Sequence, residues 1–137
     1  MNVLVDTCVW SLALRRGGSP EHPAVVELAD LIREGRAVML GLVRQELLSG
    51  VRTLRQFERL RTHLRAFPDV ALETTDHEAA AAFFNRCRAK GIQGSTVDFI
   101  LCAIASRRQW PIFTIDADFG QYAPILAIHL HASRVGQ

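Results

Sequence analysis

The chain has 137 residues, which is room for one domain, and its 16 basic and 14 acidic side chains give a formal net charge of +2. An apolar fraction of 49% excludes an intrinsically disordered chain, and no apolar run approaches the roughly 18 residues of a membrane span. The first residues lack the basic region of a secretory signal peptide. Cys8, Cys87 and Cys102 are far apart and form no CxxC motif, so neither a disulfide framework nor a cysteine zinc site is expected, and a reducing cytoplasm fits best.

The first half of the sequence predicts alternating strands and helices. Buried strands are expected over 2–5 and 37–42. Helical patterns occur, in chain order, at 9–13, 25–32, 43–50 and 53–67. The first helix is expected to stop at Arg15-Arg16-Gly17-Gly18, before a loop over 19–23, and the second at Gly35.

The second half contains the clearest buried helix. Residues 75–78 and 95–98 each match a capping box, and seven consecutive apolar residues follow the second match over 99–105. A helix that is apolar all round is expected at the centre of the domain. Strands are predicted, with decreasing support, at 111–115, 125–130 and 70–72. His129 and His131 are expected on an exposed face of the last strand.

Strands that alternate with helices throughout predict an α/β fold. We expect a central, mostly parallel sheet of four to five short strands flanked by helices, because parallel neighbours need helical crossovers. No composition shift or linker indicates a second domain. The whole chain, 1–137, is therefore expected to form a single unit.

Acidic residues fall where a parallel sheet usually carries its function, at the carboxyl ends of the strands. Asp6 and Asp116 directly follow predicted strands, while Glu46 and Asp98 fall in the first turns of predicted helices. All four therefore map to one edge of the sheet, and Asp118 is close enough in sequence to reach it. Each acid also has a local structural interpretation, as an N-cap, a capping-box partner, a turn residue or a helix-start charge.

Several carboxylates at one place repel each other unless a proton, a basic partner or a metal compensates them. Hard oxygen ligands suit Mg²⁺ or Mn²⁺, and such ions activate water for in-line attack at phosphorus. The pattern thus predicts phosphodiester hydrolysis by metal-activated water, with no need for a protein nucleophile. Three neighbouring hydroxyls either orient these acids or only cap and turn the chain: Thr7, Ser95 and Thr114.

Four short motifs occur in a characteristic order: Asp6-Thr7-Cys8-Val9-Trp10 after the first strand, Glu46-Leu47 with Gly50, Asp98 ahead of the 99–105 run, and Thr114-Ile115-Asp116-Ala117-Asp118-Phe119. Across essentially the whole chain, this set resembles the PIN-domain ribonucleases. Within that family it is similar to the VapC-type toxins of bacterial toxin–antitoxin pairs. Cys8 stands where small hydroxyl residues are frequent in the family, which puts one supporting hydrogen bond in doubt.

The resemblance implies a single PIN-like domain with Mg²⁺- or Mn²⁺-dependent endoribonuclease activity. It implies an RNA substrate, a homodimer, and a small cognate antitoxin that blocks the site with its C-terminal segment. The residues that it assigns are the metal-site acids Asp6, Glu46, Asp98 and Asp116, the accessory acid Asp118, and the supporting hydroxyls of Thr7 and Thr114.

Other interpretations remain open. Arg52, Arg55 and Arg59 share a helix face that suits RNA phosphates, an acidic antitoxin or solvent alone. A non-catalytic PIN-like module could bind RNA or protein without cutting, although unused carboxylates would cost stability. An Mg²⁺-dependent phosphatase with an Asp nucleophile needs paired acids by the first strand and a later Lys, but the DxD stands at 116–118 and the lone lysine, Lys90, ends a helix.

Overall fold

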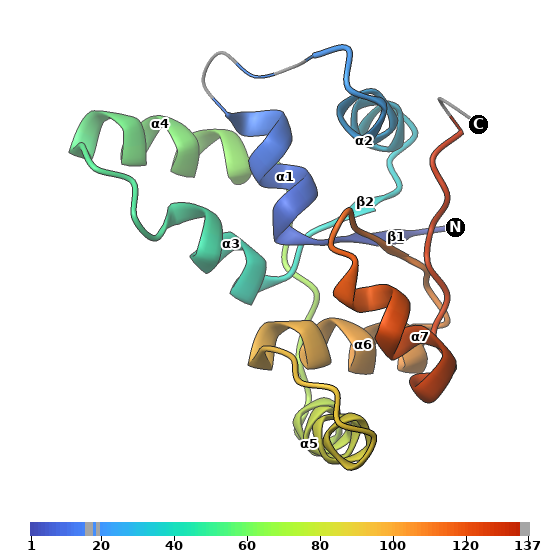
Figure 1. The fold of residues 1–137 in the computed structure, drawn as a ribbon. Coiled ribbons are helices and arrows are strands. Elements are labelled where there is room, and N and C mark those ends of the chain that lie inside the picture. Colours follow the sequence, from blue (N-terminus) through green and yellow to red (C-terminus); the bar gives the residue numbers. More distant parts are fainter. Residues whose placement is uncertain (16–17, 19, 135–137) are drawn as a thin grey trace.

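At the centre of the domain lies a parallel sheet, seen in a computed structural model that describes residues 1–15, 18 and 20–134 (Figure 1). Its strand order is β2-β1-β3, so the first strand is the central one. The strands are β1 (Val3–Val5), β2 (Ala37–Val38) and β3 (Ile112–Phe113). Leu4 pairs with a residue of each neighbour and is fully buried, as expected for an apolar strand covered on both faces.

Helices cover both faces of the sheet. In the described part of the chain they are α1 (Thr7–Leu14), α2 (Pro23–Arg33), α3 (Gly41–Leu48), α4 (Leu54–Leu64), α5 (Thr74–Ala89), α6 (Thr96–Arg108) and α7 (Asp118–Leu126). Figure 1 shows α1 and α2 on one side of the sheet and α6, backed by α5, on the other, while α3 and α4 project together from one end. The predicted α/β fold with a helix-flanked parallel sheet is confirmed. None of these helices combines the length and apolarity of a membrane span.

Helix α6 supplies much of the core, as its sequence predicted. All seven residues from Phe99 to Ala105 are buried, because α6 lies between the sheet and α5. Burial on every side explains why no polar stripe interrupts this stretch. The N-terminus of α6 is thereby fixed at the same end of the sheet as the carboxyl end of β1 (Figure 1).

The sheet has three strands among the described residues rather than the expected four to five. The strand predicted at 70–72 is wrong, because the one parallel bridge there joins Met39 with Asp69, the residue before that segment. The segment predicted at 125–130 contributes only one parallel bridge, Ile112 with Leu130. The strand expected over 37–42 ends at Val38, and its last two residues begin α3. As a result, Glu46 lies in the second turn of its helix rather than the first.

Helix α7 was not predicted from the sequence, and it contains the first two residues of the last predicted strand, 125–130. Residues 125 and 126 belong to α7, which contains Pro124 and ends at Ala127 in the left-handed conformation, with φ of 55°. The Asp-rich segment before it resembled a turn, and an internal proline argues locally against a helix. The apolar side of α7 nevertheless packs into the core through Phe119 and Tyr122.

The helix caps agree with the predictions only in part. Ser95 caps α6 by accepting a hydrogen bond from the Asp98 backbone. The capping box predicted at 75–78 is wrong in register, because α5 begins at Thr74 and the box joins Glu73 with Asp76. The loop expected over 19–23 ends one residue early, since Pro23 is the first residue of α2. Of the predicted stop signal and loop, residues 16, 17 and 19 lie outside the described part of the chain.

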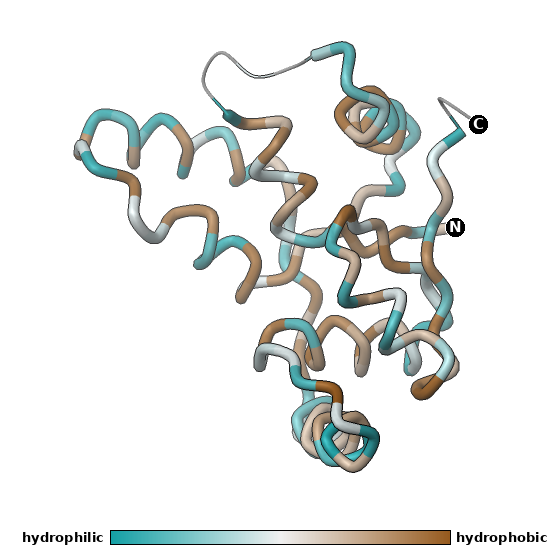
Figure 2. The backbone as a smooth tube through the Cα atoms, viewed as in Figure 1, coloured by the Kyte–Doolittle hydropathy of each residue, from teal (hydrophilic) through white to brown (hydrophobic). Residues whose placement is uncertain are grey.

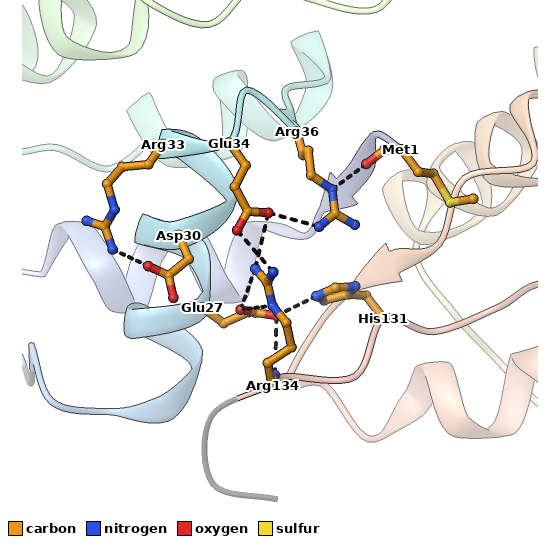
Figure 3. Close-up of polar contacts among 8 residues, drawn as sticks. All are labelled: Met1, Glu27, Asp30, Arg33, Glu34, Arg36, His131 and Arg134. Atoms are coloured by element: carbon orange, nitrogen blue, oxygen red, sulfur yellow. Dashed lines mark hydrogen bonds and ion pairs between the residues drawn. The ribbon is translucent and has the colours of Figure 1, made fainter.

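The C-terminal segment is held against α2 by a buried carboxylate (Figure 3). The Glu27 side chain is fully buried, and its oxygens lie 2.7 Å from His131 Nε2 and 3.0 Å from Arg134 Nε. Arg134 also pairs with Glu34 at 3.0 Å. His131 therefore does not lie on an exposed strand face as predicted, whereas His129 is exposed and outside any strand.

Candidate active site

The predicted acids gather around the carboxyl end of the central strand. In Figure 1 the end of β1 leads into α1, and the first turns of α3 and α6 lie around it. Asp6 is the last residue before α1, and Thr114 directly follows β3. Parallel neighbours bring these two positions together although they are 108 residues apart in sequence.

Asp6 is the most buried of these acids, with 6% of its surface exposed. Its Oδ1 caps α1 by accepting a 2.7 Å hydrogen bond from the Thr7 amide. Its Oδ2 accepts one from the Thr114 hydroxyl at 2.8 Å and one from the Cys8 thiol at 3.3 Å. Burial raises the pKa of Asp6 above its usual 3.8 despite these bonds, and the nearby charge of Asp98 raises it further.

Thr114 links Asp6 to the next two acids. Its Oγ1 accepts a 3.0 Å hydrogen bond from the Asp116 amide, and Asp116 Oδ1 accepts one at 2.9 Å from the Asp118 amide. The turn after β3 is thereby fixed by its own side chains, as is common for Asx-type turns. Thr114 thus shapes the turn and also donates a hydrogen bond to the Asp6 carboxylate.

The other two hydroxyls differ from each other. Thr7 donates a 2.6 Å hydrogen bond to Glu46 Oε1 and so connects the first turn of α1 with α3. Ser95 caps α6, because its hydroxyl accepts a 3.1 Å hydrogen bond from the Asp98 amide rather than bonding to a carboxylate. The hydrogen bond placed in doubt at Cys8 is made by its thiol, which donates to Asp6. Burial raises the pKa of the Cys8 thiol, so it remains protonated as a donor.

Asp98 lies in the first turn of α6, but its carboxylate does not complete the predicted capping box. It accepts a 2.8 Å hydrogen bond from the hydroxyl of Tyr122 on α7. Sequence reasoning missed Tyr122 because a lone aromatic residue in an apolar segment is most simply interpreted as core. An Asp near the start of one buried helix and a Tyr in the next carry no local signal of pairing.

The five acids share one electrostatic property. No Arg, Lys or His of the described residues forms an ion pair with any of them: Asp6, Glu46, Asp98, Asp116 and Asp118. Elsewhere in the described chain five other acids are paired with basic side chains, including the buried Asp76 with Arg107. Four exposed acids elsewhere in the described chain also lack an ion pair: Glu21, Glu58, Glu73 and Glu78. What distinguishes the edge of the sheet is that it holds Asp6, which among the unpaired acids of the described chain is the buried one.

Hard oxygen donors without basic partners suit a divalent cation in both chemistry and charge. Within the described ranges, no three Asp, Glu, His or Cys side chains are grouped tightly enough to enclose an ion by themselves. This arrangement fits Mg²⁺ better than a metal that needs a full protein cage, because Mg²⁺ usually binds through one or two carboxylates and completes its shell with water and substrate phosphate. Asp6 and Asp98, which are close enough to influence each other's charge, are the central candidates.

A second uncompensated surface lies on α4, where Figure 2 shows mostly hydrophilic residues. One groove of about 690 Å³ is lined by Leu14 at the end of α1 and by residues between 50 and 63, which include Arg52, Arg55, Arg59 and His63. No carboxylate in the described chain pairs with these arginines, although Arg44 and four others are ion-paired. Arg55 and Arg59 lie on α4 as predicted, whereas Arg52 precedes the helix, which begins at Leu54, and so does not share its face. All three nevertheless line the same groove.

Comparison with known protein families identifies the fold. The family model for the PIN domain matches residues 3–124, which is most of the chain. The chain belongs to the PIN domain family. The predicted resemblance to that family is confirmed, and its four motifs fall within the matched residues. No curated protein shows significant sequence similarity to this PIN domain.

Solved structures share the fold at low sequence identity. A chain of the FitAcB crystal structure from Neisseria gonorrhoeae superposes with a TM-score of 0.75 and 18% identity, covering 96% of this chain and 97% of the other. A chain of VapBC2 from Rickettsia felis, bound to a DNA fragment from its promoter, gives 0.73 and 13%, covering 96% and 98%. A toxin–antitoxin complex from Klebsiella pneumoniae gives 0.60 and 19%, covering 86% and 90%. These similarities show that the chain shares its fold with these structures over 86–96% of its length.

Proposed function

We propose that this PIN domain, spanning residues 1–137, is an Mg²⁺- or Mn²⁺-dependent endoribonuclease that acts in the cytoplasm as the VapC-type toxin of a toxin–antitoxin pair. The observation that carries the proposal is the set of five carboxylates at one edge of the sheet that lack basic partners. One of them, Asp6, is buried and has a raised pKa. A divalent cation would remove both the repulsion and the burial cost.

In this proposal Asp6, Asp98 and Asp116 hold the metal, with Glu46 as a further ligand or as the group that orients the attacking water. The bound ion supplies charge neutralisation at the phosphate and lowers the pKa of water. Thr7 and Thr114 keep Glu46 and Asp6 in place through the hydrogen bonds described above. Asp118 is an accessory acid at the rim.

The partners follow from the same proposal. Three of the proteins that share the fold are described as parts of FitAcB, VapBC2 and a toxin–antitoxin complex, which supports a cognate antitoxin for this chain. We further propose a homodimer. Size-exclusion chromatography with light scattering would distinguish a dimer from a monomer, and growth arrest on expression, relieved by the antitoxin, would support the toxin role.

The decisive experiment is cleavage of a structured RNA mixture with Mn²⁺, with EDTA, and by variants. Wild-type protein is expected to cut in Mn²⁺ only, and Asp6→Asn and Asp98→Asn are expected to lose at least about a hundredfold in rate, as when an essential charge is removed. Glu78→Gln, at an exposed acid on α5, is the matched control and should keep the wild-type rate.

Each alternative predicts a different result. RNA that is bound but never cut would support a non-catalytic module, and trapping of a phospho-aspartate would support the phosphatase. Cleavage that survives in both Asp variants would show a contaminant and remove the support for the acidic site. If Mn²⁺ at a hundred times its Kd raised the free energy of unfolding of wild type by about 2.7 kcal/mol, but not that of Asp6→Asn, the metal site would stand without any RNA assay.

A further inference from the structure

Tyr122 is the only tyrosine in the sequence, and its side chain has no exposed surface. Its ring packs against Phe99 of α6 and Phe119 of α7, with a centroid separation of 5.1 Å in each case. These contacts fix the ring between the two helices. Its hydroxyl is then held at the first turn of α6, where it donates to Asp98 Oδ2 at 2.8 Å.

The backbone next to this hydroxyl is shaped to admit it. A Cβ atom at Gly94 would lie 2.3 Å from the Tyr122 oxygen and 2.8 Å from the ring carbon that bears it. Both distances are far inside van der Waals contact, and the backbone of Gly94 does not adopt a left-handed conformation that would itself require glycine. A residue with a side chain at this position would displace the tyrosine or the loop before α6.

The hydroxyl of Tyr122 meets the Asp98 carboxylate at a single oxygen atom. Its bond occupies one Asp98 oxygen, Oδ2, and no described residue donates to the other, Oδ1.

We propose that Tyr122 is a positioning residue for metal binding: its hydroxyl fixes the Asp98 carboxylate with Oδ1 free for the ion, and Gly94 provides the space for that hydroxyl. The inference rests on the proposed metal-dependent function and adds a residue from α7 to it. Residues that hold a metal-ligating side chain in this way commonly raise metal affinity 10- to 100-fold. The reason is that a carboxylate that is not held in advance loses rotational freedom when the ion binds.

The test measures Mn²⁺ affinity by electron paramagnetic resonance on purified full-length protein, which needs no RNA and no turnover. Tyr122→Phe removes only the hydroxyl and keeps the ring, and Gly94→Ala pushes the hydroxyl away while tyrosine remains. Both are expected to bind Mn²⁺ at least about tenfold more weakly than wild type. Raising Mn²⁺ should restore RNA cleavage by Tyr122→Phe but not by Asp98→Asn, in which the ligand itself is changed.

Two controls separate positioning from packing. Phe119→Leu weakens the same aromatic cluster without touching a carboxylate, and Gly120→Ala adds a methyl group to α7 where no atom lies within 4 Å. Both should bind Mn²⁺ with an affinity within about twofold of wild type. Thermal melting in EDTA confirms that each variant is folded.

The outcomes are distinct. Wild-type affinity in Tyr122→Phe overturns the inference and leaves the proposed nuclease intact. An equal loss of affinity in Phe119→Leu also overturns it, because packing alone would then explain the effect. If wild-type protein binds no Mn²⁺, the proposed metal-dependent function fails and this inference fails with it.

Discussion

Glu27 and Asp6 are both buried carboxylates, but the protein compensates only one of them. Glu27 is surrounded by His131 and Arg134 (Figure 3). Asp6 receives hydrogen bonds from an amide, a hydroxyl and a thiol, none of which carries positive charge. Burial acts to raise the pKa of each carboxyl. At Glu27 the hydrogen bonds from His131 and Arg134 outweigh burial, and the pKa of Glu27 is lowered. At Asp6 burial outweighs the hydrogen bonds, and the pKa of Asp6 is raised.

The difference separates a structural charge from a functional one. A buried ion pair can fix one segment on another, and here it fastens residues 131–134 to α2. A buried carboxylate without a cation costs stability and is retained where a ligand will compensate it. The presence or absence of a basic partner thus distinguishes the cluster around Glu27 from the cluster around Asp6, although each contains a buried carboxylate.

The largest effect should come from removing the cations around Glu27. We expect His131→Phe with Arg134→Met to lower the free energy of unfolding by about 3 kcal/mol, the lower end for a broken buried pair, because Arg134 is half exposed. The folded-state pKa of Glu27 lies below 4.5, so this contribution is present above pH 4.5 and is lost as the pH falls below it. Urea unfolding at pH 7 and at pH 4 measures both parts.

The matching control adds Glu27→Met to the double variant. Without the buried charge there is no carboxylate left to compensate, so most of the lost stability should return. A double variant within about 1 kcal/mol of wild type would contradict the assignment of this cluster as a structural clamp.

An intermediate effect of opposite sign is expected at Asp6. Asp6→Asn in EDTA should raise the free energy of unfolding at neutral pH by about 1 kcal/mol, because the buried charge is removed while hydrogen bonds remain possible. The folded-state pKa of Asp6 lies above 3.8, so wild-type stability increases as the pH falls through that folded pKa toward 3.8. The advantage of the variant should therefore disappear near pH 3.8, as measured by urea unfolding across this range. A variant less stable than wild type at neutral pH would show that Asp6 is a structural acid like Glu27.

The smallest effect on stability is expected on α4, where the uncompensated charges are exposed rather than buried. Replacing Arg52, Arg55 and Arg59 with Gln should change the free energy of unfolding by less than about 0.5 kcal/mol.

The same triple variant tests whether this surface binds RNA. If it does, the logarithm of the RNA-binding constant should depend less steeply on the logarithm of the salt concentration, with a slope smaller in magnitude by about 2 for three lost phosphate contacts. Filter binding in the Asp6→Asn background measures it, with Arg88→Gln as the control. An unchanged slope with weaker antitoxin binding would assign the face to the protein partner, and no change in either would assign it to solvent.

The sequence alone determined the class of the fold and the types of residue at its edge. The apolar run of α6 predicted a helix buried on all sides, and the first apolar strand predicted that Asp6 lies directly after β1. These features follow from local periodicity and from the rule that parallel strands present their carboxyl ends together. The same local rules predicted the caps of α1 and α6. Asp116, by contrast, does not directly follow its strand as predicted, because β3 ends at Phe113.

Only the tertiary structure decided which acids are compensated and which are held by neutral groups. The contacts between Thr114 and Asp6, between Tyr122 and Asp98, and between His131 and Glu27 join residues 108, 24 and 104 positions apart. Such pairs leave no periodicity in the chain, because their geometry depends on how whole helices and strands pack. Packing also overrode local preference in α7, which contains Pro124 and takes in residues 125 and 126 of the predicted last strand. Charge at the edge of the sheet is thus a property of residue type, whereas its compensation is a property of the folded molecule.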